Sequence, residues 1–384
     1  MMSIPGKSGE ESLISRYIQT SLLAAGAKRS AIREDRAHRR TRIKGQVGNL
    51  AFHLPGTIRA PRRMLSAHLD TVPICVGCEP RRTGMKVTSS SGETGLGADN
   101  RAGCGVILSA ALEILKKGLP HPPLTFVWFV QEEVGLQGSR NASKRLFGNP
   151  ALAFNWDGGQ PGKMTIGATG GYRMVIEIKG QASHAGVCPE RGVSAISIAA
   201  LAIADLQTHG WHGSIRKGKR CGTSNVGVIR GGDATNVVTD RVLVRVEARS
   251  HQKSFRRRIV REIESAFYRA AKKVQNQQGQ TGSVSIEGNL DYESFLLSPS
   301  EPCVKIASAA IAAQGIEPSR AIADGGVDAN WITVHGIPTV SLGCGQINAH
   351  MVSETLDLKQ YFQACQIGLS IALGCSAEGI VDGT

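Results

Sequence analysis

The sequence has 384 residues, of which 41% are hydrophobic and 46 are glycine, so we expect a glycine-rich globular chain too long for one hydrophobic core. It has no run of eighteen apolar residues and no signal-peptide core, which excludes a membrane-spanning protein, and its nine cysteines fit a reducing, cytoplasmic compartment better than a disulfide framework. The net charge of +14 makes nucleic acid worth considering, but only 5% of residues are aromatic and they do not interleave with the basic runs, so we favour a solvated basic surface and expect no specific nucleic-acid partner.

Apolar residues at helical spacing predict a first helix over residues 8–25, and residues 48–54 have the composition of a strand. A short apolar run from Arg63 then predicts a buried strand that ends at His68 and Asp70. These two side chains share a face because they are two residues apart. The carboxylate can therefore accept one imidazole N–H while the other nitrogen binds a metal. An H-x-D pair is common by itself, so this interpretation depends on the residues downstream.

A glycine-rich segment, residues 95–105, carries Asp99 and leads into a predicted helix at residues 106–117. Glycine lets the backbone approach a ligand closely and adopt dihedral angles that other residues avoid. A phosphate-binding loop is the alternative, but neither G-x-x-x-x-G-K-[ST] nor a complete G-x-G-x-x-G is present. A carboxylate at such a junction between strand and helix is well placed to bind a cation.

Two more apolar strands are predicted, and acidic residues follow each of them. Residues 124–130 are too apolar to alternate, which indicates a central strand covered on both faces, and Glu132 and Glu133 come soon after it. Residues 151–156 form a shorter apolar run that leads into Asp157. Each of three predicted strands thus has a histidine or a carboxylate at its carboxyl end. Open α/β sheets bind their ligands at the carboxyl ends of the strands.

The sequence pattern changes between residues 173 and 286, where short strands and two helices are predicted in the order β-α-β-β-α-β. This order favours a small sheet with both helices on one face. We therefore expect an α+β domain at residues 173–286, inserted between two parts of an α/β domain at residues 1–172 and 287–384. The last part contributes another histidine, His350, after a glycine-rich turn.

Together, the candidate side chains suit a pair of divalent ions, with zinc as the first choice and cobalt or manganese as substitutes. One carboxylate must bridge the ions if they lie about 3.5–4 Å apart. One acid must stay unligated to take a proton from water. The candidates are His68, Asp70, Asp99, Glu132, Glu133, Asp157 and His350.

The chain resembles the co-catalytic zinc peptidases and deacylases, a family that includes peptidase T, glutamate carboxypeptidase, aminoacylase and acetylornithine deacetylase. The resemblance covers nearly the whole chain, and it is carried by Asp157 and by the motifs H-L-D-T-V, G-A-D-N-R-A-G, Q-E-E-V-G-L-Q-G-S and N-A-H-M-V-S-E. The segments G-A-D-N-R-A-G and D-G-G-V-D-A-N-W are most similar to peptidase T and its relatives. The resemblance implies a zinc-exopeptidase-like fold, with a mixed central sheet flanked by helices and an inserted lid domain. It implies a dinuclear zinc exopeptidase that hydrolyses short peptides.

The resemblance also implies which residues hold the two zinc ions. His68 and Asp157 would bind one ion, Glu133 and His350 would bind the other, and Asp99 would bridge them.

Further roles follow from the same resemblance. Glu132 would be the general base that activates the bridging water and later protonates the amine leaving group, while Asp70 would orient His68. A cis peptide bond is expected after Asp99. We interpret Glu354, four residues after His350, as an acid at the start of a helix.

The inserted domain resembles the lid of this family, through which some members form homodimers. There, the histidine of an S-H-A-G turn, His184 in this chain, stabilises the oxyanion, often from a partner subunit. Asn236 and Arg249 match lid positions that contact the substrate, and Arg249 is a candidate carboxylate clamp. An arginine at the end of a strand is equally often part of a plain surface ion pair.

Two alternative functions remain open from the sequence. The same chemistry could serve an N-acyl amino-acid amidohydrolase or a glutamate carboxypeptidase-like enzyme. A non-catalytic polyanion-binding protein is the alternative from another class, but a binding protein has no need of a complete ligand set together with Glu132.

Overall fold

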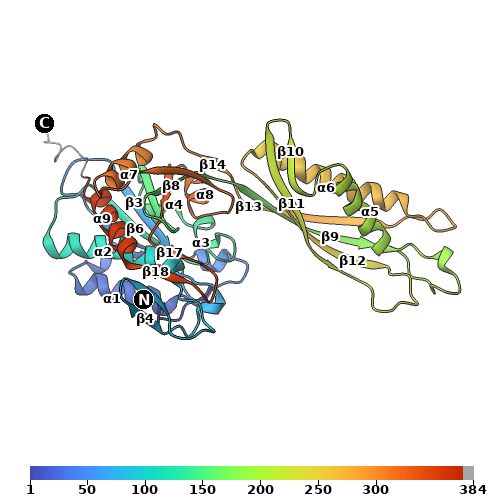
Figure 1. The fold of residues 1–384 in the computed structure, drawn as a ribbon, viewed down its shortest axis with the longest axis horizontal. Helices are drawn as coiled ribbons and strands as arrows, with labels where there is room; N and C mark the ends of the chain where they lie inside the picture. The colour runs from blue at the N-terminus through green and yellow to red at the C-terminus, as the bar shows by residue number, and fades with distance from the viewer. Residues whose placement is uncertain (375–384) are drawn as a thin grey trace. The chain divides into compact units, whose positions relative to one another are not determined.

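The computed structural model describes residues 1–374, which form two compact units (Figure 1). The main unit comprises residues 1–168 and 296–374, and the inserted unit comprises residues 169–295. The predicted bounds of the insertion are 173–286. The inserted unit extends beyond both bounds, because strands β9 (Gly170–Lys179) and β13 (Ser283–Tyr292) are longer than the apolar alternation indicates.

The main unit is built on a nine-stranded mixed sheet in the order β1-β2-β6-β3-β7-β16-β8-β14, with β15 paired to β8. Strand β3 runs parallel to both β6 and β7, so the predicted strands are neighbours at the centre of the sheet. Every residue of β6 is buried, as predicted for a strand covered on both faces. The strands are β1 (Ile32–Glu34), β2 (Leu50–Leu54), β3 (Arg63–His68), β6 (Leu124–Phe129), β7 (Leu152–Trp156), β8 (Lys163–Ala168), β14 (Phe295–Leu296), β15 (Ser319–Ala323) and β16 (Thr339–Leu342).

Helices cover both faces of this sheet, which confirms the predicted α/β class. The Trp128 indole donates to the Cys104 carbonyl of α2 (3.4 Å), whereas Phe129 makes an edge contact with Phe147 of α4. Consecutive residues of a strand point to opposite faces, so α2 and α4 lie on opposite sides. The helices are α1 (Ser12–Ala24), α2 (Ala98–Lys117), α3 (Gln137–Arg140), α4 (Lys144–Phe147), α7 (Pro302–Ala312), α8 (Ala329–Val334) and α9 (Leu358–Leu373).

A separate four-stranded sheet in the main unit was not predicted. Its order is β17-β18-β5-β4, and it pairs the segment before α2 with the segment before α9. Its strands are short and largely polar, so they have no apolar alternation to mark them in the sequence. They are β4 (Pro80–Thr83), β5 (Lys86–Ser89), β17 (Gln346–Ile347) and β18 (Thr355–Asp357).

The inserted unit has a five-stranded antiparallel sheet in the order β10-β11-β12-β9-β13. Its core joins helices α5 (Ala195–Thr208) and α6 (Lys253–Lys273) to one face of the sheet, as predicted. The prediction of four strands was wrong, because β10 (Gly213–Lys217) adds a fifth before β11 (Arg220–Arg230) and β12 (Arg241–Ser250). Most residues of β10 are exposed, so it lacks the apolar pattern of a strand.

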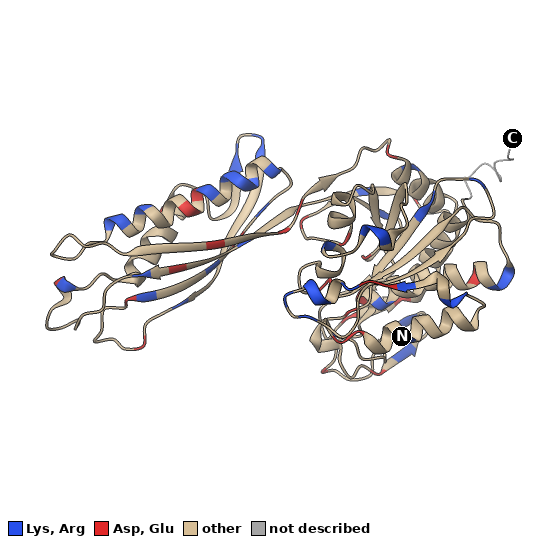
Figure 2. Cartoon of the chain, turned by 180° about the vertical axis from the view of Figure 1, so that it is seen from behind, with Lys and Arg blue, Asp and Glu red and all other residues tan. Residues whose placement is uncertain are grey.

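Lysine and arginine residues of the inserted unit are frequent along α6 and at the β10–β11 hairpin (Figure 2). Lys217 and Arg258 lie over the ring of Trp211, at 4.8 Å and 5.0 Å from its centroid. These contacts hold the two basic segments beside each other on a water-exposed face. Among residues 1–374, no helix combines the length and apolar character needed to cross a membrane.

Candidate active site

The central strands of the main unit bring most candidate residues to one edge of the sheet. Strand β3 ends at His68, Glu132 and Glu133 follow β6, and Asp157 follows β7. Because β6, β3 and β7 are parallel neighbours, their carboxyl ends meet at the same edge. The backbone of Gln131 has a φ of 55°, and this left-handed conformation turns the chain at the end of β6.

His68 and Asp70 interact as the H-x-D spacing predicts. The imidazole Nδ1 lies 3.4 Å from Asp70 Oδ1 and 3.1 Å from the Asp70 carbonyl oxygen. Asp70 also accepts the backbone N–H groups of Glu132 (2.9 Å, at Oδ1) and Glu133 (3.1 Å, at Oδ2). This fully buried carboxylate therefore orients both His68 and the turn that carries the two acids.

Asp99 lies at the start of α2, next to a cis Asp99–Asn100 peptide bond that matches the expectation. Its carboxylate faces two histidines from different parts of the chain. Asp99 Oδ1 lies 3.3 Å from His68 Nε2, and Asp99 Oδ2 lies 3.4 Å from His350 Nε2. Each oxygen thus has its own imidazole, which is the arrangement that a bridging carboxylate requires.

Glu133 and Glu132 have different partners although they are adjacent in the chain. Glu133 Oε1 lies 2.9 Å from His350 Nε2, within hydrogen-bond distance. Glu132 Oε2 lies 4.0 Å from His68 Nε2, beyond that distance. Donor atoms of His68, Asp99 and Glu133 all lie within 4.8 Å of one another, so a single ion could be held by these three.

Glu354 supports the loop that carries Asp99, a role that was not predicted from the sequence. Its buried carboxylate accepts the backbone N–H of Gly97 (2.6 Å) and that of Asp99 (2.8 Å). The interpretation as an acid at a helix start was wrong, because Glu354 precedes β18 and Asp357 is the residue that caps α9. The spacing of four residues between His350 and Glu354 does not indicate that Glu354 contacts the loop of Asp99.

The candidate side chains suit divalent metal ions, because their carboxylates carry more negative charge than the two histidines can neutralise. Burial, followed by repulsion from Asp99, raises the pKa of Asp157 to about 8. Burial is also the main cause that raises the pKa of Glu132 well above its ordinary value, with repulsion from Asp157 and Glu133 adding to it. Buried carboxylates that repel one another are stabilised by a bound cation. Two imidazoles and several carboxylates are a donor set suited to zinc.

His350 is the candidate ligand nearest to water, and its side chain is 51% exposed. Hydrogen bonds to Asp99 and Glu133 raise its pKa to about 10. In the metal-free protein a protonated His350 therefore pairs with these two carboxylates. A metal ion bound by His350 would have to displace this proton.

We expect the metal-free protein to lose thermal stability as the pH rises from 6.5 to 8. The folded pKa values of Asp157 (about 8) and His350 (about 10) both exceed the ordinary values of 3.8 and 6.5. In this window the folded state binds more protons than the unfolded state, so the free energy of unfolding falls as the pH rises. Melting temperatures measured with a chelator should show this decline, and zinc should reduce it by replacing the protons. A melting temperature that rises with pH without metal would contradict the assignment.

The inserted unit brings His184 and Asn236 together. The two chain segments form an isolated bridge between His184 and Val237, and the Ala185 N–H donates to the Asn236 carbonyl oxygen (2.9 Å). His184 Nδ1 accepts the backbone N–H groups of Gly186 and Val187, each at 3.2 Å. Since Nδ1 is an acceptor, the proton of the neutral ring is on Nε2, and this exposed imidazole can donate a hydrogen bond.

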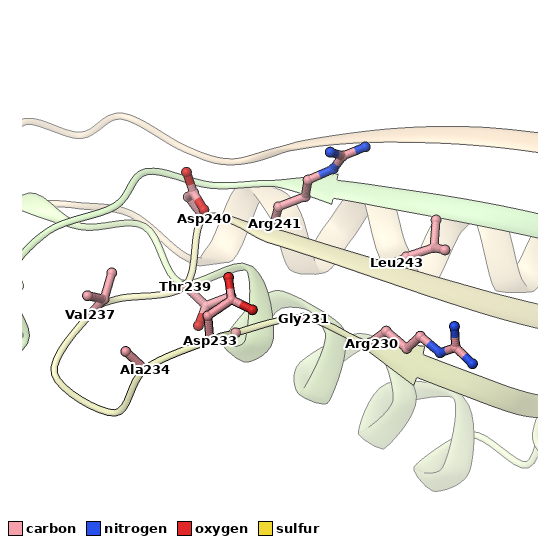
Figure 3. A pocket seen from close by; sticks show the side chains of 10 residues that line it. Arg230, Gly231, Asp233, Ala234, Val237, Thr239, Asp240, Arg241 and Leu243 are labelled. Atoms are coloured by element: carbon pink, nitrogen blue, oxygen red, sulfur yellow. The ribbon is translucent and has the colours of Figure 1, made fainter.

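A cavity of about 490 Å³ lies beside the segment that carries Asn236 (Figure 3). It is lined on one side by Arg230 and Arg241, at the facing ends of β11 and β12, and on the other by Asp233 and Val237. The lining of this cavity in the inserted unit therefore includes positively charged, negatively charged and apolar side chains.

Arg249 does not join His184 and Asn236. It lies eight residue steps along β12 from Arg241, which corresponds to about 26 Å at about 3.3 Å per residue. Its guanidinium makes a two-pronged contact with Glu247, from Nε to Oε1 (3.0 Å) and from Nη2 to Oε2 (3.1 Å). The surface ion pair, which the sequence offered as the alternative role of Arg249, is therefore present.

We compared the chain with known protein families and with known proteins. The model of Peptidase family M20/M25/M40 matches residues 64–373. The uncharacterized protein YqjE of Bacillus subtilis (strain 168) is 30% identical over 326 residues, which span 85% of this chain and 84% of that protein.

Two solved structures are similar over almost the whole chain. A tripeptidase from Staphylococcus aureus subsp. aureus Mu50 has a TM-score of 0.87 at 29% identity, covering 97% of this chain and 94% of that one. The aminopeptidase PepT from Bacillus cereus ATCC 10987 has a TM-score of 0.85 at 30% identity, covering 97% of this chain and 95% of that one.

Proposed function

The chain belongs to peptidase family M20/M25/M40 and is a hydrolase of peptide bonds, and we propose that it is a dinuclear zinc exopeptidase that acts on short peptides. The observation that supports two ions is the Asp99 carboxylate, whose two oxygens face His68 and His350 separately. Similarity to a tripeptidase and to the aminopeptidase PepT supports short peptides as substrates.

The proposed ligands divide between two ions. His68 and Asp157 would hold one ion, Glu133 and His350 would hold the other, and Asp99 would hold both. Bound zinc would supply Lewis acidity, which polarises a carbonyl and lowers the pKa of water, and cobalt or manganese could substitute. Asp70 keeps the His68 ring in the orientation and tautomer that a ligand needs.

We propose that Glu132 transfers the proton from the attacking water to the leaving amine. Its carboxylate lies beside His68 without a hydrogen bond to it, whereas Glu133 is engaged by His350. Burial raises the pKa of Glu132, which brings this acid closer to the pH at which a group can both accept and return a proton. Glu132 would take a proton from the attacking water and give it to the leaving amine.

His184 would donate from Nε2 to the oxyanion of the tetrahedral intermediate, with Asn236 beside it. Arg249 is a second proposed substrate contact, although its Nε and Nη2 atoms already donate to Glu247. About 26 Å of strand β12 separates Arg249 from the cavity near Asn236, so one short peptide cannot reach both within a single inserted unit. This separation supports a homodimer in which His184 acts on the partner's substrate.

Replacing His184 by alanine should lower kcat by roughly 10²–10³-fold with little change in KM, because the contact forms fully only in the transition state. Steady-state kinetics on a tripeptide would measure both. Mixing the His184→Ala and Glu132→Gln proteins then tests the dimer. If subunits exchange and His184 acts in trans, mixed dimers regain one complete site and activity returns. Exchange without recovered activity would place His184 in its own subunit's site, and a fully active His184→Ala protein would remove its proposed role.

The substrate class can be tested with one pair of peptides. An aminopeptidase requires a free amino group, whereas an N-acyl amino-acid amidohydrolase requires it to be blocked. We expect hydrolysis of a free tripeptide and none of its N-acetylated form. Faster hydrolysis of the acetylated peptide would favour the alternative function and contradict the proposal.

We also propose a cytoplasmic location. The eight cysteines within residues 1–374 are all free thiols, including the neighbouring buried pair Cys75 and Cys78. Free thiols of this number are typical of a reducing compartment.

A further inference from the structure

We infer that residues 4–11, which we call the N-terminal strap, hold the ligand-bearing segments of the metal centre in their binding geometry; this inference rests on the proposed function. The strap lies outside residues 64–373, the part of the chain that the family model matches. It contacts three separate segments, and each of these carries a proposed metal ligand or its support.

The first contact is with the end of β3. The Ser8 hydroxyl donates to Asp70 Oδ2 (2.6 Å), and the backbone of Thr71 donates to the Gly6 carbonyl oxygen (3.1 Å). Lys7 and Thr71 also form a parallel bridge. The strap thus extends along the segment that directly follows His68.

Ser8 completes the set of donors that fixes the plane of the Asp70 carboxylate. Oδ1 faces the His68 ring and the Glu132 N–H, while Oδ2 receives the Ser8 hydroxyl and the Glu133 N–H. Without the hydroxyl, Oδ2 keeps a single donor at 3.1 Å, so the Asp70 carboxylate is held less firmly in its plane. Because Asp70 orients His68, this loosening would reach a proposed metal ligand that Ser8 does not itself touch.

The second contact is with the turn after β6. Glu11 Oε1 accepts the Gln131 N–H (3.1 Å) and the Gly9 N–H (2.7 Å). Gln131 has the left-handed backbone that precedes Glu132, and such a conformation in a residue other than glycine needs support from its surroundings. Glu11 is fully buried and supplies that support.

The third contact is with the start of α2. The buried Arg101 side chain, two residues after Asp99, donates from Nη2 to the carbonyl oxygens of Ile4 and Gly6, both at 3.3 Å. A Cβ atom at Gly6 would lie 2.6 Å from the same Nη2 atom, so glycine allows the strap to approach this closely. The segments that carry His68, Glu133 and Asp99 are therefore joined through one short strap.

The test compares Ser8→Ala with Ser8→Thr and with Ser12→Ala as a matched control. The Ser12 hydroxyl donates to Gln46 Oε1 (2.5 Å) in the same region, and Gln46 is neither a proposed ligand nor a partner of Asp70 in the hydrogen bonds described above. Zinc affinity is measured by competition with a chelator on metal-stripped protein, and the visible spectrum of the cobalt-loaded protein reports ligand geometry. We expect Ser8→Ala to weaken zinc binding about tenfold and to change the cobalt spectrum, since partners of a ligand typically contribute 10–100-fold to affinity. Ser8→Thr should restore both, and Ser12→Ala should match the unmodified protein.

The outcomes separate this inference from the proposed function. If the unmodified protein binds zinc and Ser8→Ala binds it equally well with an unchanged cobalt spectrum, the strap has no positioning role, although the metal site stands. If the unmodified protein binds no zinc, the proposed function itself fails. Should Ser8→Ala lower the melting temperature of the metal-free protein strongly, Gly6→Ala decides, because its added Cβ meets Arg101 Nη2 while the Ser8 and Asp70 side chains are both retained. Weaker zinc binding by Gly6→Ala supports the strap, and unchanged binding contradicts it.

Discussion

Replacing Glu132 by glutamine is expected to lower kcat by about 10²–10⁴-fold while both metal ions stay bound. The amide keeps the size of the side chain but cannot accept a proton from water. The backbone N–H of residue 132 still donates to Asp70, so the turn after β6 keeps its support. Kinetics on a tripeptide, together with zinc content by elemental analysis, would measure the effect.

The control for this variant is Glu113→Gln on α2, where the side chain is 41% exposed and pairs with Lys117 four residues on. It removes the same charge far from the candidate site and should leave kcat and zinc content unchanged. If Glu132→Gln loses metal in proportion to its loss of activity, Glu132 is a ligand and the assigned role is wrong.

Replacing Asp99 by alanine is expected to remove both metal ions, whereas Asp157→Ala should mainly weaken one. Asp99 places one carboxylate oxygen toward His68 and the other toward His350, as a ligand shared by two ions would. Asp157 follows a different strand, and in the proposed centre it serves a single ion. The Asp99 N–H still donates to Glu354 in the variant, so the loop itself remains supported.

Metal stoichiometry after dialysis against a zinc buffer distinguishes the two variants. The expected values are near zero zinc per chain for Asp99→Ala and about one for Asp157→Ala, with two for the unmodified protein. Loss of one ion in both variants would contradict the bridging role. The metal-free melting temperatures of both variants should be measured alongside, because each removes a buried carboxylate.

The part of the site that could be predicted from sequence is the part encoded by local patterns. Apolar runs identify β3, β6 and β7, and a sheet geometry that brings parallel strand ends together then places His68, Glu133 and Asp157 at one edge. The pairing of His68 with Asp70 follows from a two-residue spacing. The α/β class and the inserted unit follow in the same way, from a change in the periodicity of apolar residues.

Contacts between distant segments could not be predicted, because no local pattern specifies them. Glu354 reaches Asp99 across 255 positions in the sequence, and Ser8 reaches Asp70 across 62. The strand β10 escaped detection for another reason, since its exposed side chains leave no apolar face to recognise. The distance between Arg249 and the segment of Asn236 likewise appears only when β12 is seen as one continuous strand.

The most direct test of the central claim is hydrolysis of a tripeptide by metal-stripped protein during stepwise addition of zinc. The proposed dinuclear centre predicts no hydrolysis before zinc is added and a rate that reaches its plateau at about two equivalents per chain. The Glu132→Gln protein, prepared in the same way, controls for contaminating peptidases and should stay inactive throughout. Full activity in the presence of a chelator, or no activity at any zinc level from a protein that binds two equivalents, would contradict the account.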